Sequence, residues 1–427
     1  MKTPFFFLLF LLLLLVSLSL PAQLSDFIVA DAPSSPSLHI ATGSYLVLHE
    51  LNTELNQPVF GGGTVKLSGA RVIFYDSNDR LIPRLEISLD SGHNVLVTDT
   101  SGVSEALIFS SPHAHLELQG SPFVIGLNAT IQGYGPDNFV LTNTNNSRGL
   151  IKQGVGMMPF EFPVGFDEQQ YNPVVLQAEE GALDMQVRAL EHVLINGGSG
   201  PPLATEVVDA SWEIKPVFEP NPFFSILQAE WRGGDELPGF DRNRCGVARF
   251  VPSSGWDLMV ANVAPAFGND PFGRERVALN QGGFFAVGGK ILAPETSAEV
   301  DILMGGNYVG GGLMTDALRE NNLLPTTEPY TGLGFSQAGF GGGETVNPMV
   351  FSVAGPDAIV DWLLIEIRDG ADPSVLVGTQ AAFLQRDGDI VDLDGVSDLR
   401  LRGIPEGSYF FQVQHRNHVT ARSATPL

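Results

Sequence analysis

The stretch Thr64–Asp99 reads TVKLSGARVIFYDSNDRLIPRLEISLDSGHNVLVTD. It contains four short runs in which apolar residues alternate with others, TVKLSG, RVIFYD, LEISLD and NVLVTD, and each run ends in Gly or Asp. A period of two places the apolar side chains on one face of a β-strand, and Gly and Asp favour turns. The stretch therefore predicts short strands separated by tight turns, with no helix.

Runs of the same kind recur from about residue 44 to residue 143, and several share similar endings, KLSG, LDSG, ELQG and IQGYG. Such endings indicate rungs of similar shape stacked on one another, although the sequence has no strict residue-level repeat. We therefore predict a β-solenoid-like domain over residues 23–149. An ordinary β-sandwich is the alternative, because it also consists of short alternating strands joined by turns.

The segment of residues 150–290 also reads as strands, with runs such as ASWEIKPVF, WDLMVAN and GGFFAVGG. Trp212, Trp231 and Trp256 lie in these strand-like runs, where an indole is most often a core anchor. We predict a β-sandwich module with these side chains in its core.

The last segment, residues 291–427, alternates strand-like runs with Asp-Gly and Pro/Gly turns, and one short helix is predicted over Thr315–Asn322. This pattern favours a second β-sandwich domain. The whole chain is thus predicted to be all-β, with an N-terminal β-solenoid-like segment followed by two β-sandwich-like domains.

Residues 1–22 have the features of a secretory signal peptide: Lys2, an apolar run from Phe5 to about Leu15, and a small residue, Ala22, before the predicted cleavage point. An uncleaved membrane anchor is the alternative, but the apolar run is short for a span of about 20 residues. No other stretch of the sequence is long and apolar enough to cross a bilayer. We expect a secreted or outer-surface protein.

The charge of the chain excludes two classes of partner. Acidic residues outnumber basic ones by 48 to 23, and the formal net charge is −25. Such a chain is repelled by nucleic acid and by anionic lipid headgroups. The expected partners are extracellular glycans or cell-surface components.

No familiar catalytic motif is present. The glycine-rich run GLGFSQAGF has Gly332 and Gly334 but Gln337 where a nucleotide fingerprint needs a third glycine, and the chain has no Gly-x-Ser-x-Gly or His-Glu-x-x-His motif. Cys245, the single cysteine, has arginines but no histidine near it in the sequence. We predict no catalytic residues and no cofactor, while glycosidases and polysaccharide lyases, which use scattered carboxylates, remain open.

Two histidine pairs are candidate metal ligands. His113 and His115, two residues apart, would share one face of a strand and could share a metal ion, but no third ligand is identifiable. His415 and His418, three apart, would point to opposite faces of a strand. That second pair is a poor chelator unless the segment bends.

Four aspartates lie close together in the stretch FLQRDGDIVDLDG: Asp387, Asp389, Asp392 and Asp394. A helix-loop-helix calcium loop needs oxygen ligands at its first, third and fifth positions. Counted from the first aspartate the fifth position is Val391, and counted from the third aspartate it is Val396. The stretch fails as such a loop, and the four aspartates are kept as a calcium candidate of another kind.

A hairpin explains the same stretch without a metal. Asp387 and Gly388 would be the two central residues of a tight turn, both with positive φ, and the flanking runs TQAAFLQR and DIVDLD would pair as strands. In this interpretation Ile390, Asp392 and Asp394 share one strand face.

Several short motifs, in this order, resemble a known family. In the middle segment they are NFVLTNTNNSRGLIKQ, FPVG, YNPVVL, ASWEI, DELPGFDRNRCGVARF, GWDL and FFAVGG. In the last segment they are GLMTDALRENNLLPTTEPYTGLGF, AIVDWLLIEIRD, FLQRDGDIVDLDGV and QHRNH. The first set is similar to the repeating module of large haemagglutinin-like cell-surface proteins exported by type IX secretion, and the second to a domain that often follows it.

The resemblance implies a multidomain β-rich surface or secreted protein, and no catalytic residues are established for these modules. Family members usually continue past the His-Arg-Asn-His stretch into a C-terminal sorting domain, whereas this chain stops at Leu427. We therefore expect a truncated last domain without its sorting signal. The predicted function is a non-enzymatic adhesin-like or structural protein, and the alternative is a carbohydrate-active enzyme or carbohydrate-binding module.

Overall fold

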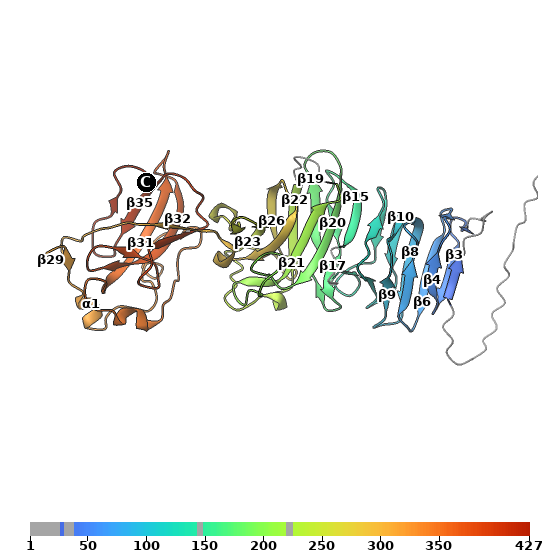
Figure 1. The fold of residues 1–427 in the computed structure, drawn as a ribbon, viewed down its shortest axis with the longest axis horizontal. Coiled ribbons are helices and arrows are strands. Elements are labelled where there is room, and N and C mark those ends of the chain that lie inside the picture. The colour runs from blue at the N-terminus through green and yellow to red at the C-terminus, as the bar shows by residue number, and fades with distance from the viewer. Residues whose placement is uncertain (1–25, 30–37, 143–147, 219–224) are drawn as a thin grey trace, which may run out of the picture.

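The computed structural model describes residues 26–29, 38–142, 148–218 and 225–427. The predicted signal peptide, residues 1–22, lies outside them. Figure 1 shows an elongated molecule in which a solenoid, a sandwich and a C-terminal part follow one another along the long axis. The all-β prediction, with a solenoid first and sandwich-like domains after it, is confirmed.

The solenoid makes about six turns between residues 38 and 165 in the described part of the chain. Its turns form two sheets in which successive strands pair in parallel. The strands given below are those that the structure describes. The eight-stranded sheet contains β1 (Asp26–Val29), β4 (Asn52–Leu55), β7 (Ile73–Asp76), β9 (Asn94–Val97), β11 (His115–Leu118), β14 (Val140–Leu141), β17 (Val164–Asp167) and the antiparallel β18 (Gln170–Tyr171). The solenoid half of the twelve-stranded sheet contains β3 (Tyr45–His49), β6 (Thr64–Gly69), β8 (Leu81–Leu89), β10 (Ser101–Phe109), β12 (Phe123–Ile125), β13 (Thr130–Gln132) and β15 (Leu150–Val155).

Apolar side chains at equivalent positions of successive turns stack into ladders inside the solenoid. In the twelve-stranded sheet one ladder consists of Leu48, Leu67, Ile87 and Phe109. In the eight-stranded sheet another consists of Ile73, Val95, Leu116, Val140 and Val164. All nine side chains are at most 4% exposed. The in-register pairing buries the apolar half of every alternating run, so the solenoid prediction holds.

Glycine is required where one turn passes close to the next. Gly133, in the ending IQGYG, has φ +69°, and a Cβ there would lie 2.0 Å from the carbonyl oxygen of Phe109 in the preceding turn. Only a residue without a side chain fits this approach at this backbone conformation. Short β2 (Leu38–His39) and β5 (Val59–Phe60) add a two-stranded parallel patch beside the first turns.

The solenoid continues into the sandwich without a break in hydrogen bonding. β15 pairs in parallel with β12 on one side and antiparallel with β20 on the other. The twelve-stranded sheet then continues through β20 (Leu183–Glu191), β21 (Val207–Pro216), β27 (Gly283–Gly288), β23 (Gly246–Val251) and β24 (Gly255–Trp256). One sheet thus spans both parts.

A buried lysine lies where the pairing changes from parallel to antiparallel. Lys152 in β15 is 5% exposed, and its ammonium donates to the carbonyl oxygens of Gly126 (2.7 Å), Leu127 (2.7 Å) and Gln153 (2.9 Å). Burial lowers the pKa of the Lys152 amine. All three N–H groups of the ammonium donate hydrogen bonds, so the side chain supplies donors to backbone carbonyls where the chain leaves β12. The amine is therefore not a free nucleophile.

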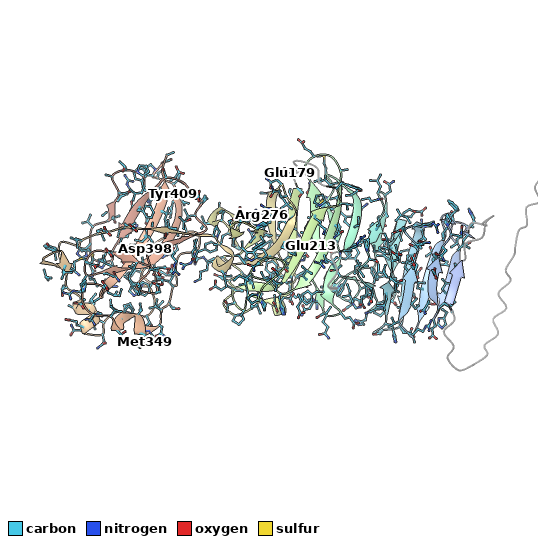
Figure 2. The ribbon with its side chains drawn as sticks, in the orientation of Figure 1. Glu179, Glu213, Arg276, Met349, Asp398 and Tyr409 are labelled. Carbon is cyan, nitrogen blue, oxygen red and sulfur yellow. The ribbon has the colours of Figure 1, made fainter. Side chains whose placement is uncertain are left out.

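A second sheet, the sandwich sheet, packs against the antiparallel half of the twelve-stranded sheet. Its strands are β16 (Phe160–Phe162), β19 (Val174–Ala178), β22 (Ser225–Trp231), β26 (Phe272–Leu279) and β25 (Phe267–Gly268). Trp212, Trp231 and Trp256 are all buried, and each indole N–H has an acceptor, so their prediction as core anchors is confirmed. Arg276, labelled in Figure 2 in this part of the molecule, makes a bidentate ion pair with Asp257 at 2.6 and 2.9 Å.

The C-terminal part is built on a curled antiparallel sheet with a core on each face. Its strands are β33 (Ile390–Val391), β32 (Leu376–Gln385), β31 (Ile359–Asp369), β35 (Tyr409–Gln414) and β36 (Ala421–Arg422). One face packs against the pair β28 (Glu295–Ala298) and β34 (Leu399–Arg402), and the other is covered by the long segment that contains α1 (Ala317–Glu320). The predicted helix is thus present, in four of its residues.

Small elements complete the described structure. They are the hairpin of β29 (Tyr308–Gly310) and β30 (Leu313–Met314), and the 3-10 turns Gly233–Asp235, Val260–Asn262, Lys290–Leu292 and Pro348–Ser352.

An arginine joins the sandwich to the C-terminal part. The half-buried guanidinium of Arg244 donates to carbonyl oxygens of Gly339 (2.7 Å), Gly342 (3.3 Å) and Gly341 in the glycine-rich loop. A backbone bond from Val260 N–H to the Gly403 carbonyl (2.9 Å) lies at the same joint. Charged donors on neutral carbonyls hold the backbone of this loop, and the half-buried ring of Phe340 in the loop packs against cores of both parts.

Replacing Arg244 by Ala should destabilise the joint by about 2 kcal/mol, because hydrogen bonds from a charged group are lost and carbonyls are left without their donor. We expect a lower Tm and faster proteolysis at the glycine-rich loop. Arg84→Ala is the control, since Arg84 forms an exposed surface pair with Glu105 (2.8 Å) and such pairs contribute little. Equal behaviour of the two variants would show that Arg244 does not hold the joint.

Candidate functional site

The aspartate stretch forms the predicted hairpin, with a different turn. β32 pairs with β33 through Phe383 and Val391, and Gln385 N–H donates to the Asp389 carbonyl at 2.9 Å. The loop has three residues between these partners, and Gly388 has φ +111° while Asp387 is not in the positive-φ region. The expected two-residue turn is therefore wrong, because a three-residue loop needs only its glycine at positive φ.

The predicted strand also ends earlier than expected. β33 stops at Val391, and the chain turns so that Asp392 N–H donates to the Ser397 carbonyl at 2.8 Å. Ile390, Asp392 and Asp394 therefore do not share a strand face. The reason is local: the carboxylate of Asp394 accepts hydrogen bonds from the N–H groups of Val396 (3.0 Å) and Ser397 (2.8 Å), which closes a turn instead of extending the strand.

The four aspartates of the calcium candidate lie in different surroundings. Asp392 is 2% exposed and pairs with Arg402 at 3.0 Å, and Asp394 is exposed in its turn. Asp387 and Asp389 lie at the hairpin loop. In the part of the chain that the structure describes, no group of three or more His, Cys, Asp or Glu side chains is arranged to hold a metal ion.

Sequence reasoning missed two neighbours of the hairpin loop, Asp301 and Asp357. Asp301 forms a β-bridge and a side-chain hydrogen bond with Asp389. Partial burial raises the pKa of Asp389, and the charges of Asp387, Asp301 and Asp357 add to this effect. These residues are separated from the loop by about 30 to 90 positions in sequence, so no local pattern could have indicated them.

The first histidine pair does not lie on one strand. β11 begins at His115, and His113 precedes it in a turn with φ +57°. His115 is 3% exposed and packs edge-on against Phe139, with ring centroids 4.6 Å apart. Neither of its ring nitrogens has a hydrogen-bond partner among the described residues. The shared-face prediction is wrong because the chain bends at His113, next to the strand start.

The second histidine pair meets because the segment bends. β35 ends at Gln414, and the Nδ1 atoms of His415 and His418 lie 2.9 Å apart. The Nε2 atom of His415 lies 3.0 Å from the carboxylate of Asp361, which Arg416 also contacts at 2.8 Å. The prediction of opposite strand faces does not hold, since these residues follow the strand in a turn.

A cluster of tyrosines and glutamates lies where the solenoid joins the sandwich. Tyr171 O–H donates to one oxygen of Glu161 (2.8 Å), and Tyr134 O–H donates to the other (3.1 Å). Tyr171 also packs on Phe139, with centroids 5.2 Å apart. These residues come from β16, β18 and two loops, so the cluster fastens the last solenoid turns to the sandwich sheet.

A second carboxylate belongs to the same cluster. Burial raises the pKa of Glu230, and the charge of Glu161 adds to the effect although Gln228 donates a hydrogen bond to it. Burial and the nearby Glu161 charge raise the pKa of Tyr134 to about 12, so its hydroxyl remains a donor. Two carboxylates in unequal surroundings are the pattern of a general acid paired with a base or nucleophile. Sequence reasoning named none of these residues, because they lie in four separate runs.

Cys245 is buried, and its thiol lies 3.6 Å from the Arg242 carbonyl oxygen. Burial raises its pKa to about 12, so the sulfur is not a thiolate at neutral pH.

Comparison of the chain with models of known protein families, with curated proteins and with solved structures found no match. None of the described helices is long and apolar enough to span a membrane. The class that the fold defines is an all-β protein in which a parallel solenoid shares a sheet with an antiparallel sandwich.

Replacing His115 by Leu should stabilise the solenoid at acid pH. Burial lowers the pKa of His115 below its usual 6.5, so the unfolded state binds the proton more readily and stability is lost as pH falls below 6.5. The variant should lose this pH dependence and gain about 1–3 kcal/mol, because a polar ring without partners is removed. Denaturant unfolding at pH 5 and 7.5 measures this.

The control for this prediction is His49→Leu, since His49 lies at an exposed position of β3. It should leave the acid sensitivity unchanged. An equally acid-sensitive His115→Leu protein would place the cause at another residue.

Calcium should leave the Tm unchanged, since Asp392 already has an arginine partner and Asp394 is hydrogen-bonded within its turn. A titration followed by thermal unfolding tests this. A rise in Tm that the double variant Asp387→Ala with Asp389→Ala abolishes would establish a calcium site at the hairpin loop.

Proposed function

We propose that this chain is an exported, non-enzymatic β-protein of the cell surface or the extracellular medium, with an adhesin-like or structural role. The observation that carries the proposal is the twelve-stranded sheet, which joins solenoid and sandwich in one hydrogen-bonded body. A body held by continuous pairing and a filled interior suits a spacer or display element. Contacts with partners would use loops and exposed strand edges.

The haemagglutinin-like, type IX secretion assignment belongs to the same proposal. It is supported by the order of the short motifs in the middle and last segments and by the signal-like residues 1–22. The net charge of −25 supports extracellular glycans or neutral surface components as partners over nucleic acid or anionic lipid.

One observation favours a carbohydrate-active enzyme as the second candidate. Glu161 and Glu230 are near enough for their charges to interact, and their surroundings differ. Tyr134, half-buried beside them, offers a hydroxyl and an aromatic ring to a sugar. In this candidate function Glu230 is the general acid and Glu161 the base or nucleophile.

A panel of polysaccharides and glycans, assayed for binding and for depolymerisation with residues 23–427, separates the two candidates. We expect binding of a panel member without turnover. The matched variants are Glu161→Gln at the cluster and Glu105→Gln on the solenoid surface.

Turnover that Glu161→Gln abolishes and Glu105→Gln preserves would replace the proposed function by the enzyme. Turnover unaffected by either variant would also contradict a non-enzymatic role and place the catalyst elsewhere. Absence of binding across the panel would count against a glycan adhesin.

A further inference from the structure

We propose that His415 and His418 form a site for a divalent first-row transition metal ion, with copper(II) the tightest. The site lies in the turn after β35 and uses the two Nδ1 atoms, with water in the remaining coordination positions. Three features of the turn carry this: a fixed tautomer of His415, whose side chain is 6% exposed, the spacing of the two nitrogens, and the half-exposed position of His418.

Asp361 fixes the tautomer of His415. This carboxylate is 2% exposed, and one of its oxygens lies 3.0 Å from Nε2 of His415 and 2.8 Å from the Arg416 guanidinium. Its other oxygen accepts from Trp362 N–H at 2.8 Å. The ring proton of His415 lies on Nε2, because this nitrogen donates a hydrogen bond to the buried carboxylate. The Nδ1 atom of His415 therefore carries the lone pair. A carboxylate behind a metal-binding imidazole is the usual way proteins orient such a ligand.

The spacing of the two nitrogens suits two bonds to one ion. Nδ1 of His415 and Nδ1 of His418 lie 2.9 Å apart and share a single proton in the hydrogen-bonded arrangement. Metal–nitrogen bonds of about 2.0 Å place adjacent ligands of a tetragonal ion about 2.8 Å apart and those of a tetrahedral ion about 3.3 Å apart. The observed distance is close to the tetragonal value, which copper(II) and nickel(II) prefer.

Binding requires only small changes in this turn. The ring of His418 turns so that both lone pairs converge. Its Nδ1 proton leaves to solvent and its Nε2 takes up a proton from solvent, so the ring that binds the ion is neutral. The backbone N–H of Asn417 donates to Nδ1 of His415 at 3.2 Å in the metal-free turn. When the ion binds, this N–H donates to water instead, since Asn417 is exposed. Arg416 does not repel the ion strongly because Asp361 already neutralises it, and the chain as a whole has a net charge of −25.

Titration of copper(II) into the untagged protein, followed by calorimetry and electron paramagnetic resonance, tests the site. We expect one ion per chain and hyperfine structure from two imidazole nitrogens. His418→Ala should weaken binding roughly tenfold or more, because one of the two ligands is lost. Affinity should also fall as the pH is lowered, since both imidazoles must be neutral to bind.

His49→Ala is the matched control, because it removes an exposed histidine that lies on β3 of the solenoid. Its binding should equal that of the unmodified protein. His418→Asn, which keeps a polar side chain in the turn, provides a second variant in case the alanine protein does not fold, and it should show the same loss. No binding by the unmodified protein, or unchanged binding by a folded His418 variant, would overturn the proposal.

Discussion

Stacking of apolar side chains between successive turns is the interaction on which the molecule depends. Each short run of the solenoid has too few residues to be stable alone, and its apolar face is buried only when the next turn pairs with it in register. The ladder from Ile73 to Val164 shows how this constraint runs through the solenoid. A slip of one residue would turn every such side chain outward, so the register follows from the alternation.

The same constraint shapes the transition to the sandwich. A parallel stack ends in a strand edge with unpaired backbone groups, which invites uncontrolled pairing with other chains. Here β15 continues the parallel stack on one side and accepts an antiparallel partner, β20, on the other. The edge of the parallel stack is therefore paired within the molecule. Because β15 is held in place by the solenoid, it also fixes the position of β20 in the sandwich.

Hydrogen-bonded charged side chains lie where the parts of the molecule meet. Lys152 fills its three donor positions with carbonyls at the end of the parallel stack, Glu161 accepts two tyrosine hydroxyls beside it, and Arg244 holds carbonyls of the glycine-rich loop. At such joints the backbone leaves regular pairing, and polar atoms that are not paired with strands must find other partners. This explains why hydrogen-bonded charged side chains are found at these joints.

The sequence by itself determined the all-β class, the solenoid in the first segment and the three tryptophan anchors, because a period of two and the turn residues act locally. It also located the hairpin at Asp387, but not its turn type or the end of β33, which hydrogen bonds of Asp394 decide. Only the tertiary structure brought Glu161, Glu230 and two tyrosines together, joined His415 to His418 and placed Asp361 behind them. The two histidines meet in a local turn, whereas the other contacts span up to about 100 residues of sequence and follow from strand pairing between distant runs, which no local pattern encodes.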